Sequence, residues 1–136
     1  MKYPTYPVLI ENVKFRGYPN AGLYLTRFAE RDLPALMIGN EETQEVYAIC
    51  NLNPAGMYEL KEFEFAVKDY SENEGMMEWM IENGLLEPAH DAYPSYWVSV
   101  PICRATPKLQ RLIKEACANY ERTRTFEEEL DGLEEW

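Results

Sequence analysis

The cysteines and the single histidine are the residues best suited to nucleophilic or metal chemistry, and their spacing favours neither role. Cys50, Cys103 and Cys117 form no C-x2-C knuckle of the kind that structural zinc sites contain. His90 lies in a loop-like sequence without the strand, turn and helix context of a catalytic nucleophile. We therefore expect no catalytic residue, no metal and no cofactor, and we predict that the protein is not an enzyme.

Carboxylates dominate the charged residues. The chain of 136 residues contains 24 acidic and 13 basic residues, and its formal net charge is -11. With so many carboxylates, two of them meet in space by chance, so pairing alone selects no general acid or base. The charge also disfavours direct binding to nucleic acid, because such binding begins by neutralising phosphates. The favoured chemistry is attraction to a basic surface on another protein.

The acidic residues concentrate in the middle of the chain, where residues 59–90 contain nine acidic and two basic residues. On a rigid body such carboxylates can stand in for phosphates in a basic groove. The alternative is a solvated face that only keeps the protein soluble. We predict a partner-binding acidic surface formed by Glu72, Glu74, Glu78 and Glu82.

The same stretch carries signals for a helix. Ser71 and Glu74 have the spacing of a capping box, and Gly84 can end a helix in the left-handed conformation. These residues predict a helix over 72–83. The four-residue spacing then places Glu74, Glu78 and Glu82 on one exposed face.

Strand signals fill the rest of the chain up to the last third. The third and fourth predicted strands are joined as a hairpin, and Pro94 and Pro101 are expected to bound the last strand. The predicted strands cover residues 8–15, 23–28, 35–38, 45–52, 63–67 and 96–100. We predict an α+β fold with a mainly antiparallel sheet of five or six strands, one long C-terminal helix packed on it and a shorter helix between strands.

The long helix is predicted over 107–122. Thr106 suits an N-cap, and Pro107 suits the first helical position. One face of this helix is apolar and must pack against the sheet, and it contains Leu109, Leu112, Ile113, Ala116, Cys117 and Tyr120. We expect residues 1–124 to form a single domain.

Residues 125–136 have the pattern of a separate acidic amphipathic helix. Thr125 and Glu128 form a second capping box. An apolar stripe recurs at helical spacing and is predicted to bind a partner or to pack on the protein itself, and it consists of Phe126, Leu130, Leu133 and Trp136. Docking on the protein itself is favoured by the basic residues of the preceding helix, since they are its chain neighbours.

Two short segments resemble each other, Tyr3-Pro4-Thr5-Tyr6 and Tyr93-Pro94-Ser95-Tyr96. In one interpretation, proline sets an extended entry to a strand while the tyrosine rings cover its edge. In the other, the tyrosines form an aromatic contact surface. Both interpretations stay open on the sequence alone.

The composition also bears on location. The N-terminus lacks the pattern of a targeting segment, and no apolar stretch approaches the roughly 20 residues that cross a bilayer. The odd number of cysteines, each beside apolar neighbours, argues against a disulfide framework. We expect a soluble, cytoplasmic protein.

Residues 18–100 carry a series of short motifs: Tyr18 to Gly22, Leu23 to Phe28, Cys50-Asn51-Leu52, Glu82-Asn83-Gly84-Leu85 and Tyr93-Pro94-Ser95-Tyr96. This pattern resembles an uncharacterised domain family found on conjugative elements and phages of Gram-positive gut bacteria. The family has no catalytic motif to transfer. The resemblance implies a setting among mobile-element accessory proteins, which include anti-restriction and anti-CRISPR proteins that inhibit host nucleases. The chain after Cys103 departs from the pattern.

These observations lead to one prediction and three alternatives. The prediction is an acidic, non-enzymatic protein that binds and inhibits a nucleic-acid-processing defence enzyme, a CRISPR effector or a restriction system, by nucleic-acid mimicry. The first alternative is a mobile-element accessory or regulatory protein that binds a protein partner without mimicry. A small enzyme with an unrecognised site is the second, and a direct DNA binder is the third. Binding by a mimic is sensitive to salt and competed by nucleic acid, whereas accessory binding is indifferent to both.

Overall fold

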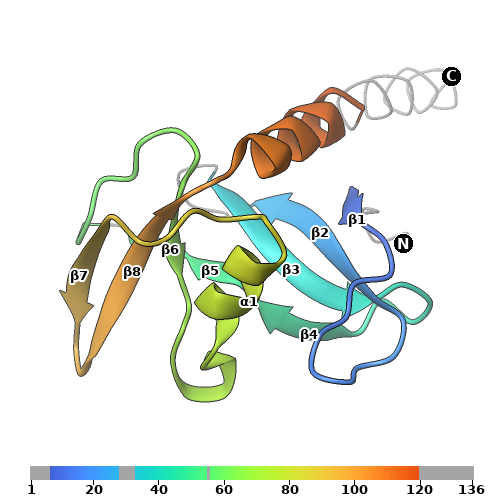
Figure 1. Cartoon of the computed structure of the whole chain (residues 1–136), viewed down its shortest axis with the longest axis horizontal. Coiled ribbons are helices and arrows are strands. Elements are labelled where there is room, and N and C mark those ends of the chain that lie inside the picture. The colour runs from blue at the N-terminus through green and yellow to red at the C-terminus, as the bar shows by residue number, and fades with distance from the viewer. Residues whose placement is uncertain (1–6, 28–32, 55, 120–136) are drawn as a thin grey trace, which may run out of the picture.

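The computed structural model describes residues 7–27, 33–54 and 56–119 and has an α+β fold. Its strands form two antiparallel four-stranded sheets, with the orders β1-β2-β3-β4 and β5-β6-β8-β7. Two α-helices accompany them, α1 (Met76–Glu82) and a helix over 107–119 (Figure 1). No helix in these ranges is long and apolar enough to cross a membrane.

The first sheet is a meander of neighbouring strands: β1 (Val8–Ile10), β2 (Ala21–Arg27), β3 (Pro34–Asn40) and β4 (Val46–Ile49). The predicted β3–β4 hairpin is confirmed, with Met37 paired to Ile49. The first strand is much shorter than predicted. It ends at Ile10 because Asn12 turns the chain in the left-handed conformation with φ 52°.

The second sheet contains β5 (Asn51–Leu52), β6 (Glu64–Val67), β7 (Asp91–Ser95) and β8 (Val98–Arg104). The sequence had predicted a single strand over 96–100 bounded by two prolines. Instead Pro94 and Pro101 lie inside β7 and β8, and Tyr96 and Trp97 form the turn between them. Proline is tolerated because β7 is an edge strand and Pro101 lies beyond the last β6 pairing, Ala66 with Ile102.

The predicted single sheet is wrong because the strand predicted over 45–52 changes sheets at Cys50. The Cys50 N–H donates to the Leu36 carbonyl of the first sheet at 2.8 Å, and its carbonyl accepts from the Lys68 N–H beside the second sheet at 2.9 Å. Beyond Cys50 the backbone no longer pairs with β3, and the Asn51 side chain makes the hydrogen bonds to β3 instead. The amide oxygen of Asn51 accepts from the Leu36 N–H at 2.8 Å, and its nitrogen donates to the Pro34 carbonyl at 3.0 Å.

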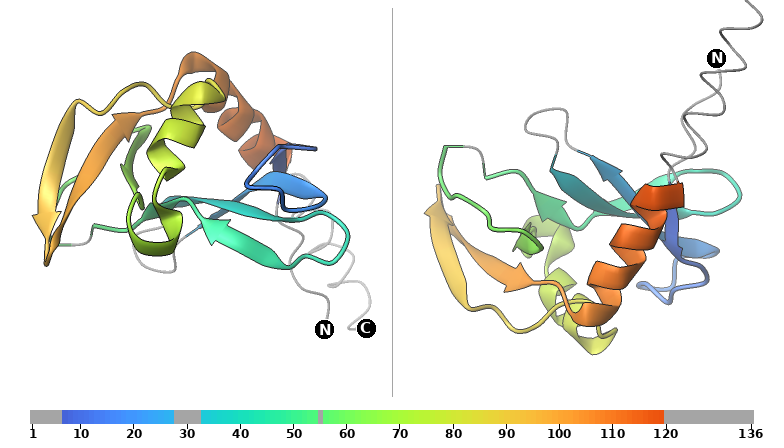
Figure 2. Two further views of the ribbon diagram at one scale, coloured as in Figure 1. Left: turned by 60° about the horizontal axis from the view of Figure 1, so that its bottom comes forward. Right: turned by 90° about the horizontal axis from the view of Figure 1, so that it is seen from above.

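Both sheets and both helices share a main buried core. Figures 1 and 2 show α1 between the two sheets and the helix over 107–119 running from the end of β8 towards β1 and β2. The predicted apolar face of that helix is confirmed for its buried members Leu109, Ile113 and Ala116. Its predicted N-cap is also confirmed, since the Thr106 hydroxyl accepts from the Leu109 N–H at 3.3 Å.

The predicted helix over 72–83 is wrong at its start. A 3-10 turn, η1 (Ser71–Asn73), comes first, and α1 begins only after Gly75, which has φ 92°. Ser71 adopts φ 53° and makes no capping hydrogen bond for the helix, so the predicted capping box does not form. Gly84 does adopt the predicted left-handed conformation, with φ 69°.

Candidate functional site

The predicted acidic surface is exposed, but it is not one helical face. Glu72 lies in η1, Glu74 lies in the following turn, and Glu78 and Glu82 lie one turn apart on α1. Because α1 begins at Met76, only Glu78 and Glu82 share a helix face. The four carboxylates therefore come from three consecutive local structures.

Two side chains outside the acidic residues fix this segment in place. The two guanidinium nitrogens of Arg16 donate to the backbone carbonyls of Glu72 and Glu74, each at 2.5 Å. On the inner side, the buried Asn73 side chain donates to the Ile49 carbonyl at 2.6 Å. The backbone of the turn is thus held from two directions while its carboxylates remain exposed. Neither Arg16 nor Asn73 was predicted from the sequence, because both contacts join residues far apart in the chain.

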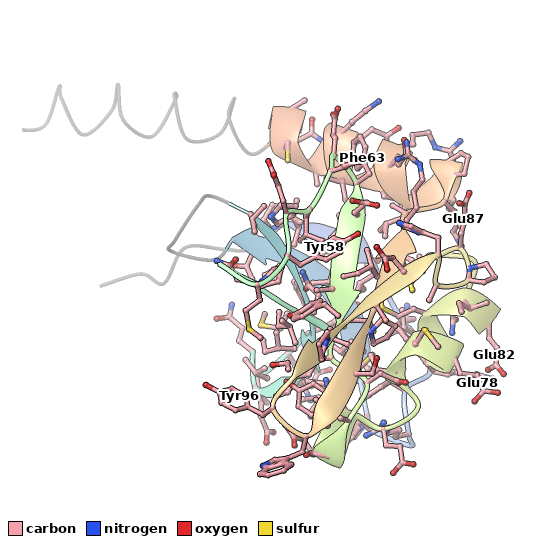
Figure 3. The ribbon with its side chains drawn as sticks, turned by 90° about the vertical axis from the view of Figure 1, so that its left-hand side faces the viewer. Tyr58, Phe63, Glu78, Glu82, Glu87 and Tyr96 are labelled. Atoms are coloured by element: carbon pink, nitrogen blue, oxygen red, sulfur yellow. The ribbon has the colours of Figure 1, made fainter. Side chains whose placement is uncertain are left out.

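The glutamates differ in how they are neutralised. Glu72 forms an ion pair with Lys68 at 2.8 Å, and the hydrogen bond from Lys68 lowers the pKa of Glu72. Within the described ranges no basic side chain pairs with Glu74, Glu78, Glu82 or the exposed Glu87. Figure 3 shows Glu78, Glu82 and Glu87 along one side of the molecule. We call Glu74, Glu78, Glu82 and Glu87 the acidic face.

Glu87 was not among the predicted site residues. It follows the short stretch after α1, and its N–H donates to the Arg104 carbonyl at 2.9 Å, beside β8. This backbone bond positions Glu87 near the end of α1 although it lies outside the helix. Its charge was visible in the sequence, but its position on the same side of the molecule as Glu78 and Glu82 depends on how the chain returns to the second sheet.

The single histidine, which is partly exposed, contacts a carboxylate that is largely buried. His90 Nε2 lies 2.5 Å from Glu64 Oε2, linking the start of β7 to β6. Burial raises the pKa of Glu64, but the hydrogen bonds from the Lys61 N–H and from His90 outweigh it and lower the pKa. Nearby, the hydrogen bond from Tyr58 to Asp91 raises the pKa of Tyr58 to about 12. These contacts hold β7 against its neighbours.

Two of the three cysteines that could have served nucleophilic or metal chemistry lie in the core. Cys50 and Cys103 are fully buried. Burial raises the pKa of Cys50 to about 12 and that of Cys103 to about 11, so both thiols are protonated at neutral pH. Among the described residues, no three His, Cys, Asp or Glu side chains are grouped as metal ligands.

A second surface feature is the turn of the β7–β8 hairpin. Tyr96 and Trp97 are 96% and 98% exposed, and Tyr96 projects from the hairpin in Figure 3. The two tyrosines of the predicted repeat behave differently. Tyr93 is buried and stacks on Tyr58 with ring centroids 5.8 Å apart, whereas Tyr96 points into solvent. We call Tyr96 and Trp97 the aromatic tip.

The other predicted contact elements lie beyond the described residues. They are the first member of the tyrosine repeat, residues 3–6, and the terminal stripe of Phe126, Leu130, Leu133 and Trp136. Docking of that stripe, on the protein itself or in a partner, stays a prediction.

Comparisons with known proteins add no identification. No family model, no curated protein and no solved structure matches this chain. The resemblance to proteins of mobile elements therefore stays a prediction.

Proposed function

We propose that this protein is a non-enzymatic inhibitor that occupies the basic, nucleic-acid-binding surface of a host defence enzyme, a CRISPR effector or a restriction system. The observation that carries the proposal is the acidic face, with exposed carboxylates that have no ionic partner in the described part of the chain. Its setting is the bacterial cytoplasm, where such enzymes act on foreign DNA.

The geometry of the acidic face suits the replacement of phosphates. Glu78 and Glu82 are one helical turn apart, about 5.4 Å along the axis, so their charges form a short row. A nucleic-acid strand also presents negative charges in a regular row, one per about 3.4 Å of the duplex axis. The preceding turn, which carries Glu74, is held by Arg16. Carboxylates on a fixed backbone lose little conformational freedom on binding, which favours affinity.

The alternative function is a regulatory protein that binds its partner without mimicking nucleic acid. The aromatic tip favours this alternative, because exposed tyrosine and tryptophan are typical of protein contacts that do not depend on charge. The two functions differ in their response to salt and to competitor DNA.

The test is capture of proteins from a bacterial host lysate on the immobilised full chain, with and without competitor duplex DNA. We expect a nuclease or its effector complex to be retained, to be released by the competitor, and to lose activity when the soluble chain is added. Retention that is indifferent to both DNA and salt would favour the regulatory alternative. Retention of no nucleic-acid-processing enzyme would contradict the proposal.

Two matched charge-reversal variants distinguish the contribution of the acidic face to binding from that of the net charge. The variant Glu78→Lys with Glu82→Lys removes the charge row, whereas Glu42→Lys with Glu45→Lys makes the same change in net charge at the exposed β3–β4 turn. We expect the first variant to weaken binding at least about tenfold at low salt and the second to have a much smaller effect. Equal losses in both would show that only net charge matters.

A further inference from the structure

The aromatic tip is the most exposed apolar feature of the described chain, and its conformation is unfavourable for its residue types. Tyr96 and Trp97 fill a two-residue turn between the paired residues Ser95 and Val98. Tyr96 adopts φ 53°, a region where glycine or asparagine is usual and a bulky side chain is strained. Placing a tyrosine there destabilises the turn, and its side chain is almost wholly in solvent.

Two other long or bulky side chains at positive φ make contacts that offset the strain. Arg16, at φ 47°, donates to two backbone carbonyls. Phe63, at φ 61°, packs against the main core beneath the Lys114 ammonium group. Tyr96 is 96% exposed and gains no comparable packing against the described residues. The pairing of β7 with β8 supports this strained turn, and the Tyr96 side chain is left available to a partner.

The hairpin presents the tip rigidly. Five residue pairs join β7 to β8, and Tyr93 is buried two residues before Ser95. Tyr93 stacks on Tyr58, and the Tyr58 hydroxyl donates to Asp91 at 2.8 Å, so the base of the hairpin is fixed. Rigid aromatic side chains bind with a small loss of conformational entropy.

The charge of the hairpin indicates the class of partner. Residues 92–103 contain no charged residue, although the whole chain has a net charge of -11. Stacking on nucleic acid requires basic residues that follow the phosphates, and binding to an anionic membrane requires lysine or arginine near the surface. Residues 92–103 have neither, and Arg104 lies at the end of β8 away from the tip. An apolar pocket in a protein is the ligand that its chemistry fits.

A second copy of this chain is a poor occupant. Two aromatic side chains bury about 150–250 Å² each, below the roughly 800 Å² per partner of a stable interface. A concave pocket in a larger partner avoids this limit, because it surrounds the tip while other surfaces supply the remaining area. We propose that the aromatic tip inserts into an apolar pocket of the protein partner and supplies the part of the affinity that does not depend on salt.

This inference depends on the proposed function only for the identity of the partner. The first experiment replaces Trp97 in the full chain with the photoreactive residue benzoylphenylalanine, illuminates the bacterial lysate and maps the cross-linked peptide by mass spectrometry. The control places the same residue at Val46, an exposed apolar position in the first sheet. We expect position 97, and not position 46, to cross-link to an apolar segment of a folded protein.

The second experiment measures affinity for that cross-linked protein, purified, over a range of salt concentrations. We expect Trp97→Ala to weaken binding about 30-fold at every salt concentration, and Trp97→Phe to restore much of the loss. The dependence on salt should be unchanged, because no charge is removed. Val46→Ala should leave affinity unchanged.

Several results would overturn the inference: cross-linking of position 97 to a second copy, to lipid, to nucleic acid or to nothing, or full affinity in Trp97→Ala. Failure of the proposed function has a different signature. In that case the partner cross-linked at position 97 is insensitive to competitor DNA and to Glu78→Lys with Glu82→Lys, while the effect of Trp97→Ala persists.

Discussion

The α1 segment and the β7–β8 hairpin both present exposed side chains, but they obtain their backbone geometry in opposite ways. Around α1, the left-handed positions at Gly75 and Gly84 are occupied by glycine, so the turns are relaxed. At the tip of the hairpin the left-handed position is occupied by Tyr96. Ser71 in η1 also adopts a left-handed φ of 53°, but its side chain is small, whereas the left-handed position at the tip carries a bulky aromatic ring.

The two regions also differ in how they contact a partner. The acidic face has charge without apolar surface, and its interactions act over a distance and weaken with salt. The aromatic tip has apolar surface without charge, and its interactions act only on contact. Together they predict association that charge accelerates and dissociation that the tip slows.

The largest effect on stability is expected at Asn51, where the chain passes from the first sheet to the second. Asn51→Ala leaves the Leu36 N–H and the Pro34 carbonyl without partners beside the core, so we expect a loss of about 2–4 kcal/mol in the free energy of unfolding. Asn83→Ala removes an exposed side-chain bond to the Trp79 carbonyl and is the control. Urea denaturation of both variants measures the difference, and similar losses would contradict the role assigned to Asn51.

Arg16→Ala should loosen the acidic segment without affecting the hairpin. Two hydrogen bonds to the carbonyls of Glu72 and Glu74 are lost, and we expect a destabilisation of about 1–2 kcal/mol. Amide exchange should accelerate over 71–75 and stay unchanged over 91–104. The exposed Arg111→Ala is a control for loss of charge. Unchanged exchange over 71–75 would show that Arg16 does not hold this turn.

Tyr96→Gly tests whether the strain at the tip is real. Glycine adopts φ 53° without penalty, so we expect the variant to be more stable by about 1 kcal/mol while binding to the partner weakens. Ser99→Gly, on the exposed side of β8, should instead lower stability by about 0.5–1 kcal/mol. Thermal unfolding of both variants checks these opposite signs, and a less stable Tyr96→Gly would refute the strain.

The smallest effect concerns pH and the pair that joins β6 to β7. The pKa of Glu64 is lower in the folded protein than in the unfolded chain, so its contribution is present above the unfolded pKa and is lost as the pH falls through the folded value. Glu64→Gln should therefore flatten the decline of stability below about pH 4.3. Denaturation curves at several acidic pH values test this, and an equally steep decline in the variant would exclude Glu64 as a contributor.

Local patterns in the sequence correctly predicted the α+β class, the β3–β4 hairpin, the capping of the long helix by Thr106 and the left-handed Gly84. Each of these features depends on residues within a few positions of one another, so it forms without contacts between distant residues. The exposure of Glu78 and Glu82 followed in the same way, from a local apolar and polar pattern.

Tertiary structure alone decided the division into two sheets, the separation of η1 from α1 and the outward position of Tyr96 and Trp97. The strand over 45–52 looks continuous in the sequence. It changes sheets because the Cys50 N–H bonds to Leu36 of the first sheet while the Cys50 carbonyl bonds to Lys68 beside the second sheet. The turn at 96–97 contains none of the glycine or asparagine that marks a hairpin, so the sequence did not predict it. The strained turn is tolerated only because β7 and β8 are paired on either side of it. The local spacing of residue types does not determine contacts between distant residues, or the backbone strain that such contacts can support.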